Sequence, residues 1–242
     1  MTALSPDGDD PVDASTWDRL RREVVQDAAA VGVAVGTYGI SYGALGTSSG
    51  LSVLQTCALS VLAFTGGSQF ALIGVIGSGG AAASGVATAL MLGFRNLLYG
   101  LRLAPTLQVR GALRLPAAQL VIDETTAMTI SQTEARASRL AFWATGLMVY
   151  TLWNIATLVG AVGASALGDP KRFGLDAAVG AAFLGLLWPR LKHATTWFVA
   201  VAAAAVALTL TPFLSPGLPV LVAGLVAVAV GIVRPQAAQE VS

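Results

Sequence analysis

A run of 67 residues, Ala28–Phe94, contains no Asp, Glu, Lys, Arg or His. As a helix with about 1.5 Å per residue, this run would measure roughly 100 Å, or about three passages of a ~30 Å hydrocarbon core. About one residue in four is charged in a water-soluble domain. The run therefore predicts helices that pack within a membrane.

The composition of the whole chain agrees with this prediction. Of its 242 residues, 55% are hydrophobic and 11% are charged, and the mean hydropathy is +0.72. We predict an all-α, polytopic transmembrane helical bundle with roughly six to eight crossings. The single cysteine, Cys57, excludes an internal disulfide, and the single histidine, His193, excludes a histidine-rich metal site. Neither a metal nor a cofactor is expected.

The two ends of the chain differ from its middle. Residues 1–14 are acidic and polar and are predicted to form a disordered tail, which does not have the form of a signal peptide. Residues 15–27 are predicted to form an amphipathic interfacial helix, with Ser15 as its N-cap and arginines near the headgroups. A solvated charged turn is the alternative for this segment. Residues 28–234 then form a single transmembrane transport domain, and residues 235–242 form a short C-terminal tail.

Glycines recur along the first predicted membrane helix with alternating spacings of four and three residues. This spacing keeps them on one stripe of the helix surface. Small residues on such a stripe let a second helix approach closely, which is how membrane helices associate. We predict that the stripe packs against a helix of this chain or of a partner, and a casual excess of glycine is the alternative. The glycine stripe consists of Gly32, Gly36, Gly39, Gly43, Gly46 and Gly50.

The segment Thr65–Phe70 interrupts the second predicted helix, which begins near Ser52, with the sequence Thr-Gly-Gly-Ser-Gln-Phe. Adjacent glycines make a poor continuous helix, and backbone freed within a membrane needs partners inside protein or beside a cavity. Transporters often bind their solute at such interruptions. A second interruption, Gly77–Gly80, leaves Phe70–Gly77 and Ser84–Phe94 too short to span. We predict glycine-interrupted, discontinuous helices here, although Thr65–Phe70 alone would also suit a simple turn.

Two adjacent acids, Asp123 and Glu124, lie in a short segment flanked by apolar residues. Ionisable groups at membrane depth are costly and commonly mark ion, proton or substrate pathways. A carboxyl group removed from water holds its proton more tightly, so it can exchange protons at physiological pH. We predict that one acid couples transport to protons while the other pairs with Arg95. An ordinary pair of acids in an interfacial loop is the alternative.

Basic residues in the second half of the chain indicate its orientation. If the intervening helices alternate, three groups fall on one side of the membrane: Arg136 with Arg139, Arg190 with Lys192, and Arg234. The uncharged loop Pro212–Pro219 then falls on the other side, and the positive-inside rule places the C-terminus in the cytoplasm. The first half gives no such assignment, because crossings cannot be counted through its interrupted helices.

Several short motifs follow one another along the chain: Gly43-Ala44-Leu45, Gly66-Gly67-Ser68-Gln69-Phe70, Arg95-x-x-Leu98-Tyr99-Gly100, Leu103-Ala104-Pro105, Asp123-Glu124-Thr125 and Gly174-Leu175-Asp176. In order and spacing, this set resembles the AzlC family, the large subunits of two-component branched-chain amino acid exporters. The resemblance covers roughly residues 28–234. The chain departs from the family pattern where Gly36 and Gly180 replace usual prolines and where Gly93 and Asn96 replace the Asn and His that commonly flank the Arg95 position. These departures leave the exact substrate open.

The resemblance implies export of branched-chain or other hydrophobic amino acids across the cytoplasmic (inner) membrane, with a small AzlD-type membrane subunit as partner and no nucleic acid. An amino acid is a zwitterion. Its site needs N–H groups at a half-helix terminus for the carboxylate, and an acid or carbonyls for the ammonium. The candidate substrate-binding residues are Gly66, Gly67, Ser68, Gln69 and Tyr99, the candidate proton-coupling residues are Asp123 and Glu124, and Arg95 is their charge partner.

Other functions make different demands on the sequence. A membrane-embedded enzyme would need a nucleophile with its base, or a set of metal ligands, and the chain has no H-E-x-x-H motif and too few His and Cys residues for a cluster. We predict no enzymatic activity. A passive channel stays an alternative, because sequence does not reveal alternating access. A permease component of a different, ATP-driven transporter would need a separate ATPase chain, since no Walker motif occurs here.

Overall fold

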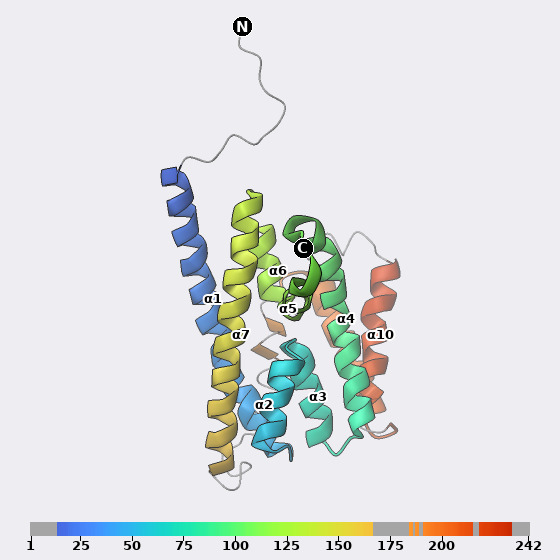
Figure 1. The fold of residues 1–242 in the computed structure, drawn as a ribbon. Helices are drawn as coiled ribbons and strands as arrows, with labels where there is room; N and C mark the ends of the chain where they lie inside the picture. The colour runs from blue at the N-terminus through green and yellow to red at the C-terminus, as the bar shows by residue number, and fades with distance from the viewer. Residues whose placement is uncertain (1–13, 167–183, 186, 189–190, 215–217, 234–242) are drawn as a thin grey trace.

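The computed structural model describes residues 14–166, 184–185, 187–188, 191–214 and 218–233, and within these ranges every regular element is helical. The elements are α1 (Ala14–Ser48), α2 (Val53–Leu62), α3 (Gly67–Gly77), α4 (Ala82–Leu107), the 3₁₀ turn η1 (Gly111–Leu113), α5 (Arg114–Gln119), α6 (Asp123–Ile130), α7 (Ala135–Ala166), α9 (Ala194–Leu210) and α10 (Leu218–Val233). Figure 1 shows them side by side as one bundle.

The bundle confirms the predicted all-α fold. Two of its helices, α1 and α7, are long and apolar enough to cross a membrane, and several shorter apolar helices accompany them. The predicted number of crossings stays a prediction. Several features of the sequence analysis lie wholly or largely outside the described residues: the N-terminal tail, the C-terminal tail, the motif Gly174-Leu175-Asp176, Gly180, Arg190 and Arg234.

The helices α1 and α7 run in parallel and form the most extensive contact of the bundle (Figure 1). The predicted glycine stripe makes this contact, and its partner is therefore a helix of the same chain. A Cβ atom added at Gly39 would lie 2.6 Å from the carbonyl oxygen of Trp153, so the two backbones touch here. Four glycines of the stripe each face an α7 residue: Gly32 on Met148, Gly36 on Leu152, Gly39 on Trp153 and Gly43 on Thr157.

Two glycines of the predicted stripe lie elsewhere. Gly46 faces the side chain of Thr56 on α2. Gly50 follows the end of α1, and its prediction as a packing residue is wrong, because it has a φ of +92° and no atom near its Cβ position. It serves the tight turn into α2, where a left-handed backbone favours glycine. A glycine that the sequence analysis missed, Gly160 of α7, lies directly against the backbone of Ile40.

The predicted interfacial helix, residues 15–27, is the first part of α1 rather than a separate element. Ser15 accordingly lies within the helix, so its prediction as an N-cap is wrong. The start of α1 is attached to the start of α7, because the Arg136 guanidinium lies 3.7 Å from the ring centroid of Trp17 in a cation–π contact. One continuous helix thus joins the charged N-terminal segment to the glycine stripe.

Two helical hairpins enter the bundle from opposite ends. Figure 1 shows α2 and α3 together in its lower half and α5 and α6 in its upper half, while α4 runs along both. The predicted break is confirmed, because α2 ends at Leu62 and α3 begins at Gly67, with Gly66 at a φ of +63°. Ser84–Phe94 is not a half-helix, as the sequence suggested, but part of the 26-residue helix α4, which continues through Arg95 to Leu107.

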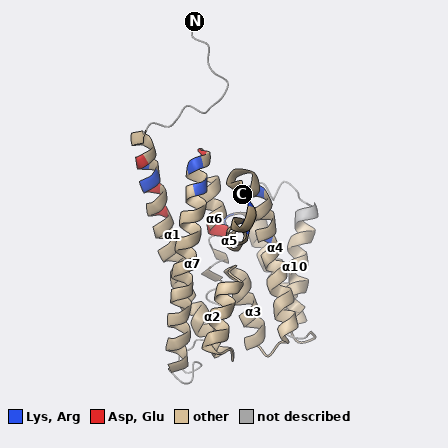
Figure 2. Ribbon diagram, viewed as in Figure 1, with Lys and Arg blue, Asp and Glu red and all other residues tan. Residues whose placement is uncertain are grey.

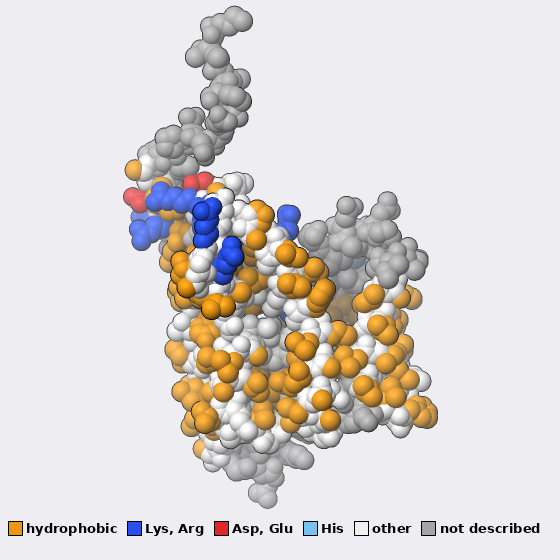
Figure 3. Space-filling model, turned by 45° about the vertical axis from the view of Figure 1, so that its right-hand side comes forward, with side chains coloured by type: hydrophobic (Ala, Val, Ile, Leu, Met, Phe, Trp, Pro, Cys, Tyr) orange, Lys and Arg blue, Asp and Glu red, His pale blue; other side chains and the backbone are white. Residues whose placement is uncertain are grey.

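Charged residues gather at one end of the bundle. Figure 2 shows no charged residue in the lower half of its described part, and the Lys and Arg residues lie towards the end where α1 and α7 begin. On the face that Figure 3 shows, apolar side chains are spread over the bundle below this charged end. The exposed apolar side chains of the bundle include Leu90, Leu101 and Leu147, each more than half accessible. This distribution suits a bundle surrounded by lipid with one basic face.

Candidate functional site

A cavity of about 280 Å³ lies where the tips of the two hairpins meet. Its polar residues are Thr65, Arg95, Asp123 and Glu124, and most of the remaining wall is apolar. The walls come from α1, the α2–α3 turn, α4, the start of α6 and α7, so every long helix described contributes. The apolar and glycine residues of the wall are Val35, Tyr38, Phe64, Gly66, Gly67, Phe70, Leu92, Ile122, Val149, Trp153 and Leu187.

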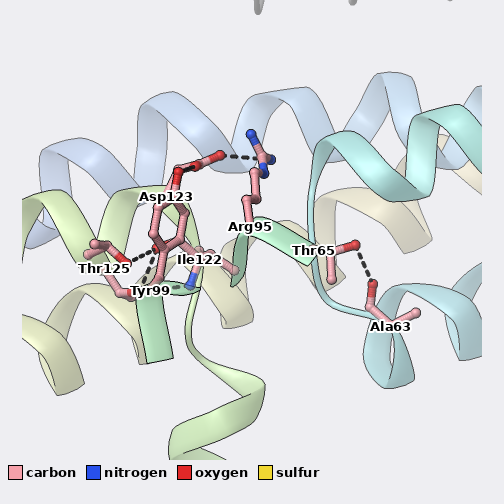
Figure 4. Close-up of polar contacts among 8 residues, drawn as sticks. Ala63, Thr65, Arg95, Tyr99, Ile122, Asp123 and Thr125 are labelled. Atoms are coloured by element: carbon pink, nitrogen blue, oxygen red, sulfur yellow. Dashed lines mark hydrogen bonds and ion pairs between the residues drawn. The ribbon is translucent and has the colours of Figure 1, made fainter. Parts of the chain in front are cut away.

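An ion pair forms one side of this cavity. The Nη2 atom of Arg95 lies 2.8 Å from Oδ2 of Asp123, and the Tyr99 hydroxyl donates a hydrogen bond of 2.8 Å to Oδ1 of the same carboxylate. Figure 4 shows Arg95 and Tyr99 reaching Asp123 from α4. The predicted pairing of Arg95 with one of the two acids is therefore present. Both partners are partly buried, with side-chain exposures of 30% for Arg95 and 23% for Asp123.

Asp123 and Glu124 occupy the first turn of α6, where the helix dipole favours negative charge. Thr125 fixes this terminus, because its hydroxyl oxygen accepts a hydrogen bond from the Ile122 N–H at 3.0 Å (Figure 4). Both acids line the cavity and are half-buried. This position brings both acids beside the tip of the other hairpin.

The glycine break forms the opposite side of the cavity. Gly66 and Gly67 line it, and a Cβ atom added at Gly67 would lie 3.6 Å from Nη2 of Arg95. The N–H groups of Gly67 and Ser68 have no carbonyl acceptor within α3, because they belong to the first turn of that helix. The N-terminus of α3 and the Arg95 guanidinium thus bring positive charge to the same region.

Three of the five predicted substrate-binding residues do not line the cavity. Ser68 and Gln69 are 3% and 2% exposed and pack inside the bundle. The side-chain amide of Gln69 donates hydrogen bonds to the carbonyls of Leu59 and Ser60 at 3.1 and 3.4 Å, so it closes its own hairpin. Tyr99 acts on the cavity through Asp123. The structure therefore places these three residues outside the cavity wall, and their contact with substrate stays a prediction.

An aromatic cluster supports the apolar wall. The rings of Tyr42, Phe70 and Trp153 pack within about 6 Å of one another, two of the three pairs edge to face. Phe70 and Trp153 line the cavity, whereas Tyr42 is fully buried behind them. The sequence analysis identified neither aromatic residue as part of the site, because a buried aromatic on a membrane helix looks the same whether it faces a cavity or the core.

Comparison with known proteins gives one match. Residues 30–167, more than half of the chain, match the sequence profile of a family described as AzlC protein. No curated protein and no solved structure matches the chain. The matched region includes α2–α6 and most of α1, and it contains every polar residue of the cavity wall.

Proposed function

We propose, because this chain belongs to the AzlC family, that it is a secondary active transporter that exports branched-chain or other hydrophobic amino acids. It would reside in the cytoplasmic membrane as a multi-pass protein, couple export to protons and act together with a small AzlD-type membrane subunit. The observation that carries the proposal is the cavity, where charged groups of both signs face an apolar wall at the meeting point of two broken helices.

The cavity suits an amino acid in both size and chemistry. Its volume of about 280 Å³ is near the lower end of the range of about 300–1,000 Å³ for small-molecule sites. The substrate carboxylate would lie at the N-terminus of α3 near Arg95, and the ammonium would lie near the carboxylates of α6. A hydrophobic side chain would then contact Phe70, Val149 and Trp153.

The two acids take different parts in the proposed coupling. Asp123 forms an ion pair with Arg95 and accepts a hydrogen bond from Tyr99, so it holds the hairpin and α4 together. Glu124 lies on the cavity wall and is the acid that we assign to proton binding and release. A proton on Glu124 and a substrate ammonium beside it would compete for one negative charge, which couples the two movements.

The proposal of a partner subunit rests on the family alone. The glycine stripe was predicted to pack against a helix of this chain or of a partner, and most of it packs against α7 of this chain. It therefore gives no support to a heteromer. The expected AzlD-type subunit would contact some other part of the lipid-facing surface.

The charge distribution supports an orientation for the whole bundle. By the positive-inside rule, the charged end of the bundle would face the cytoplasm, and α1 would begin there. We expect Arg110→Cys, beyond the end of α4, to react with a membrane-impermeant maleimide in inside-out vesicles only. Ser78→Cys, at the uncharged end, should react in right-side-out spheroplasts only. Both variants carry Cys57→Ser, and the reverse labelling pattern would contradict the orientation.

The function is tested by counterflow in proteoliposomes. Vesicles are loaded with unlabelled leucine and diluted into a trace of radiolabelled leucine, with this chain alone, with the small subunit alone and with both. A transporter is expected to accumulate label transiently above equilibrium without ATP, and glutamate loading serves as the matched control. Label that equilibrates without an overshoot would indicate a channel. The absence of any flux for leucine, isoleucine, valine, methionine and phenylalanine would refute the proposal.

A further inference from the structure

The end of α2 poses a hydrogen-bonding problem that the rest of the bundle solves. α2 ends at Leu62, whose side chain is 75% exposed on the surface of the bundle, and the carbonyl groups of its last turn point beyond the helix. Lipid and apolar side chains offer such groups no donor, so protein must supply one. Leu59 keeps a backbone bond from the Ala63 N–H, which leaves the carbonyls of Ser60, Val61 and Leu62 for other donors.

Side chains from three other elements provide these donors. Gln69 of α3 bonds Ser60, within the same hairpin. The amide of Gln119, the last residue of α5, donates to the carbonyls of Val61 and Leu62 at 2.8 and 3.3 Å. The hydroxyl of Tyr150 on α7 donates to the same Val61 carbonyl at 3.2 Å. The first hairpin is therefore attached by Gln119 to the second hairpin and by Tyr150 to α7.

The residues that make these attachments are close in sequence to residues of the cavity wall. Gln119 precedes Asp123 by four residues, and Val61 precedes the wall segment Phe64–Gly67 by three. Moving the tip of α2 away from α5 would leave the Leu62 carbonyl without a donor and the Val61 carbonyl with Tyr150 alone. An unpaired carbonyl group is costly beside lipid. The bonds of Gln119 thus set the distance between the glycine break and the acids of α6.

We infer that Gln119 and Tyr150 are positioning residues of the site, which hold the two hairpin tips at the separation that an amino acid requires. This inference rests on the proposed function, because the ligand that it concerns is the amino acid of the cavity. The shared Val61 carbonyl makes the two residues interdependent. Either single loss leaves this carbonyl one donor, whereas the double loss leaves it none.

The test compares Gln119→Met and Tyr150→Phe, which remove the donors at nearly constant size, in the leucine counterflow assay. Each single variant should raise KM about threefold, as expected for one neutral hydrogen bond, with the maximal rate nearly unchanged. The double variant should raise KM by more than the product of the two single effects. Gln119→His, which keeps a donor, should restore most of the affinity. Gln132→Met, at an exposed turn after α6, is the matched control.

A second measurement needs no substrate. Hydrogen exchange at the backbone amides of Gly66–Phe70 should be faster in the double variant than in the wild type, while exchange in α7 away from Tyr150 stays the same. Unchanged KM and unchanged exchange in the double variant would overturn the inference. If the wild-type chain transports none of the amino acids but hydrogen exchange is still faster in the double variant, the proposed function is refuted. The attachment of the hairpin by Gln119 and Tyr150 would then still hold.

Discussion

Glu124→Gln is expected to abolish amino-acid export driven by a pH gradient while amino-acid exchange continues. The substitution keeps the size and hydrogen-bonding capacity of the side chain but removes its titratable group. Exchange moves the loaded carrier in both directions and does not require the empty carrier to release a proton, so it should survive. Both activities are measured in proteoliposomes, with the pH gradient imposed by dilution and exchange followed as labelled leucine against unlabelled leucine.

Asp123→Asn is expected to act on the folded protein instead. It removes the charge that bonds Arg95 and Tyr99, at 2.8 Å in each case, and leaves the guanidinium without its counter-charge. A hydrogen bond to a charged group contributes about 1.5–3 kcal/mol, so expression and melting temperature should fall. The double variant Asp123→Asn with Arg95→Gln removes both charges and should melt above the single Asp123→Asn variant.

The two acids are distinguished by these results. If Asp123→Asn is stable and uncoupled while Glu124→Gln is fully active, the two roles are reversed. If both variants keep full gradient-driven export, neither acid couples the proton, and their place in the first turn of α6 serves only to stabilise that helix.

The features that could be predicted from the sequence depend on chemistry that a membrane makes unambiguous. Adjacent glycines with a following Ser-Gln pair interrupt a helix at Gly66 because no local pattern favours its continuation. An isolated arginine at the end of a long uncharged run needs an acid, and Asp123 is among the few acids available. In each case the residue types present allow few alternative structures.

The features that could not be predicted depend on which way a side chain turns. Gln69 looks the same in the sequence whether its amide reaches a ligand or the carbonyls of Leu59 and Ser60. Gln119 lies far from Val61 along the chain, and only the meeting of the two hairpins makes it a cap. The length of α4 was missed because the apolar segment was ended at Phe94, the last residue of the uncharged run, whereas Arg95 pairs with Asp123 and the helix continues through it.

Gly43→Leu is expected to prevent stable folding, and Gly36→Leu should lower the melting temperature substantially. At Gly43 an added Cβ atom would meet the carbonyl oxygen of Thr157, and at Gly36 it would lie 2.8 Å from Cβ of Leu152. Overpacking of a core typically costs about 1–3 kcal/mol, and backbone cannot move aside as a side-chain end does. The measurement is thermal unfolding of the purified chain in detergent, followed by fluorescence or size-exclusion chromatography.

A pair of alanine variants on α7 separates packing from helix propensity. Gly160 lies against the Ile40 backbone, whereas Gly163, one turn farther along, has no atom within 4 Å of its Cβ position. Alanine favours a helix over glycine by about 1 kcal/mol at either site, so Gly163→Ala should stabilise the chain. Gly160→Ala should destabilise it, because the added methyl group separates α1 from α7. Equal melting temperatures for these two variants would show that the two backbones do not touch. The apolar wall that α1 and α7 together give the cavity would then have to be held in place by some other contact.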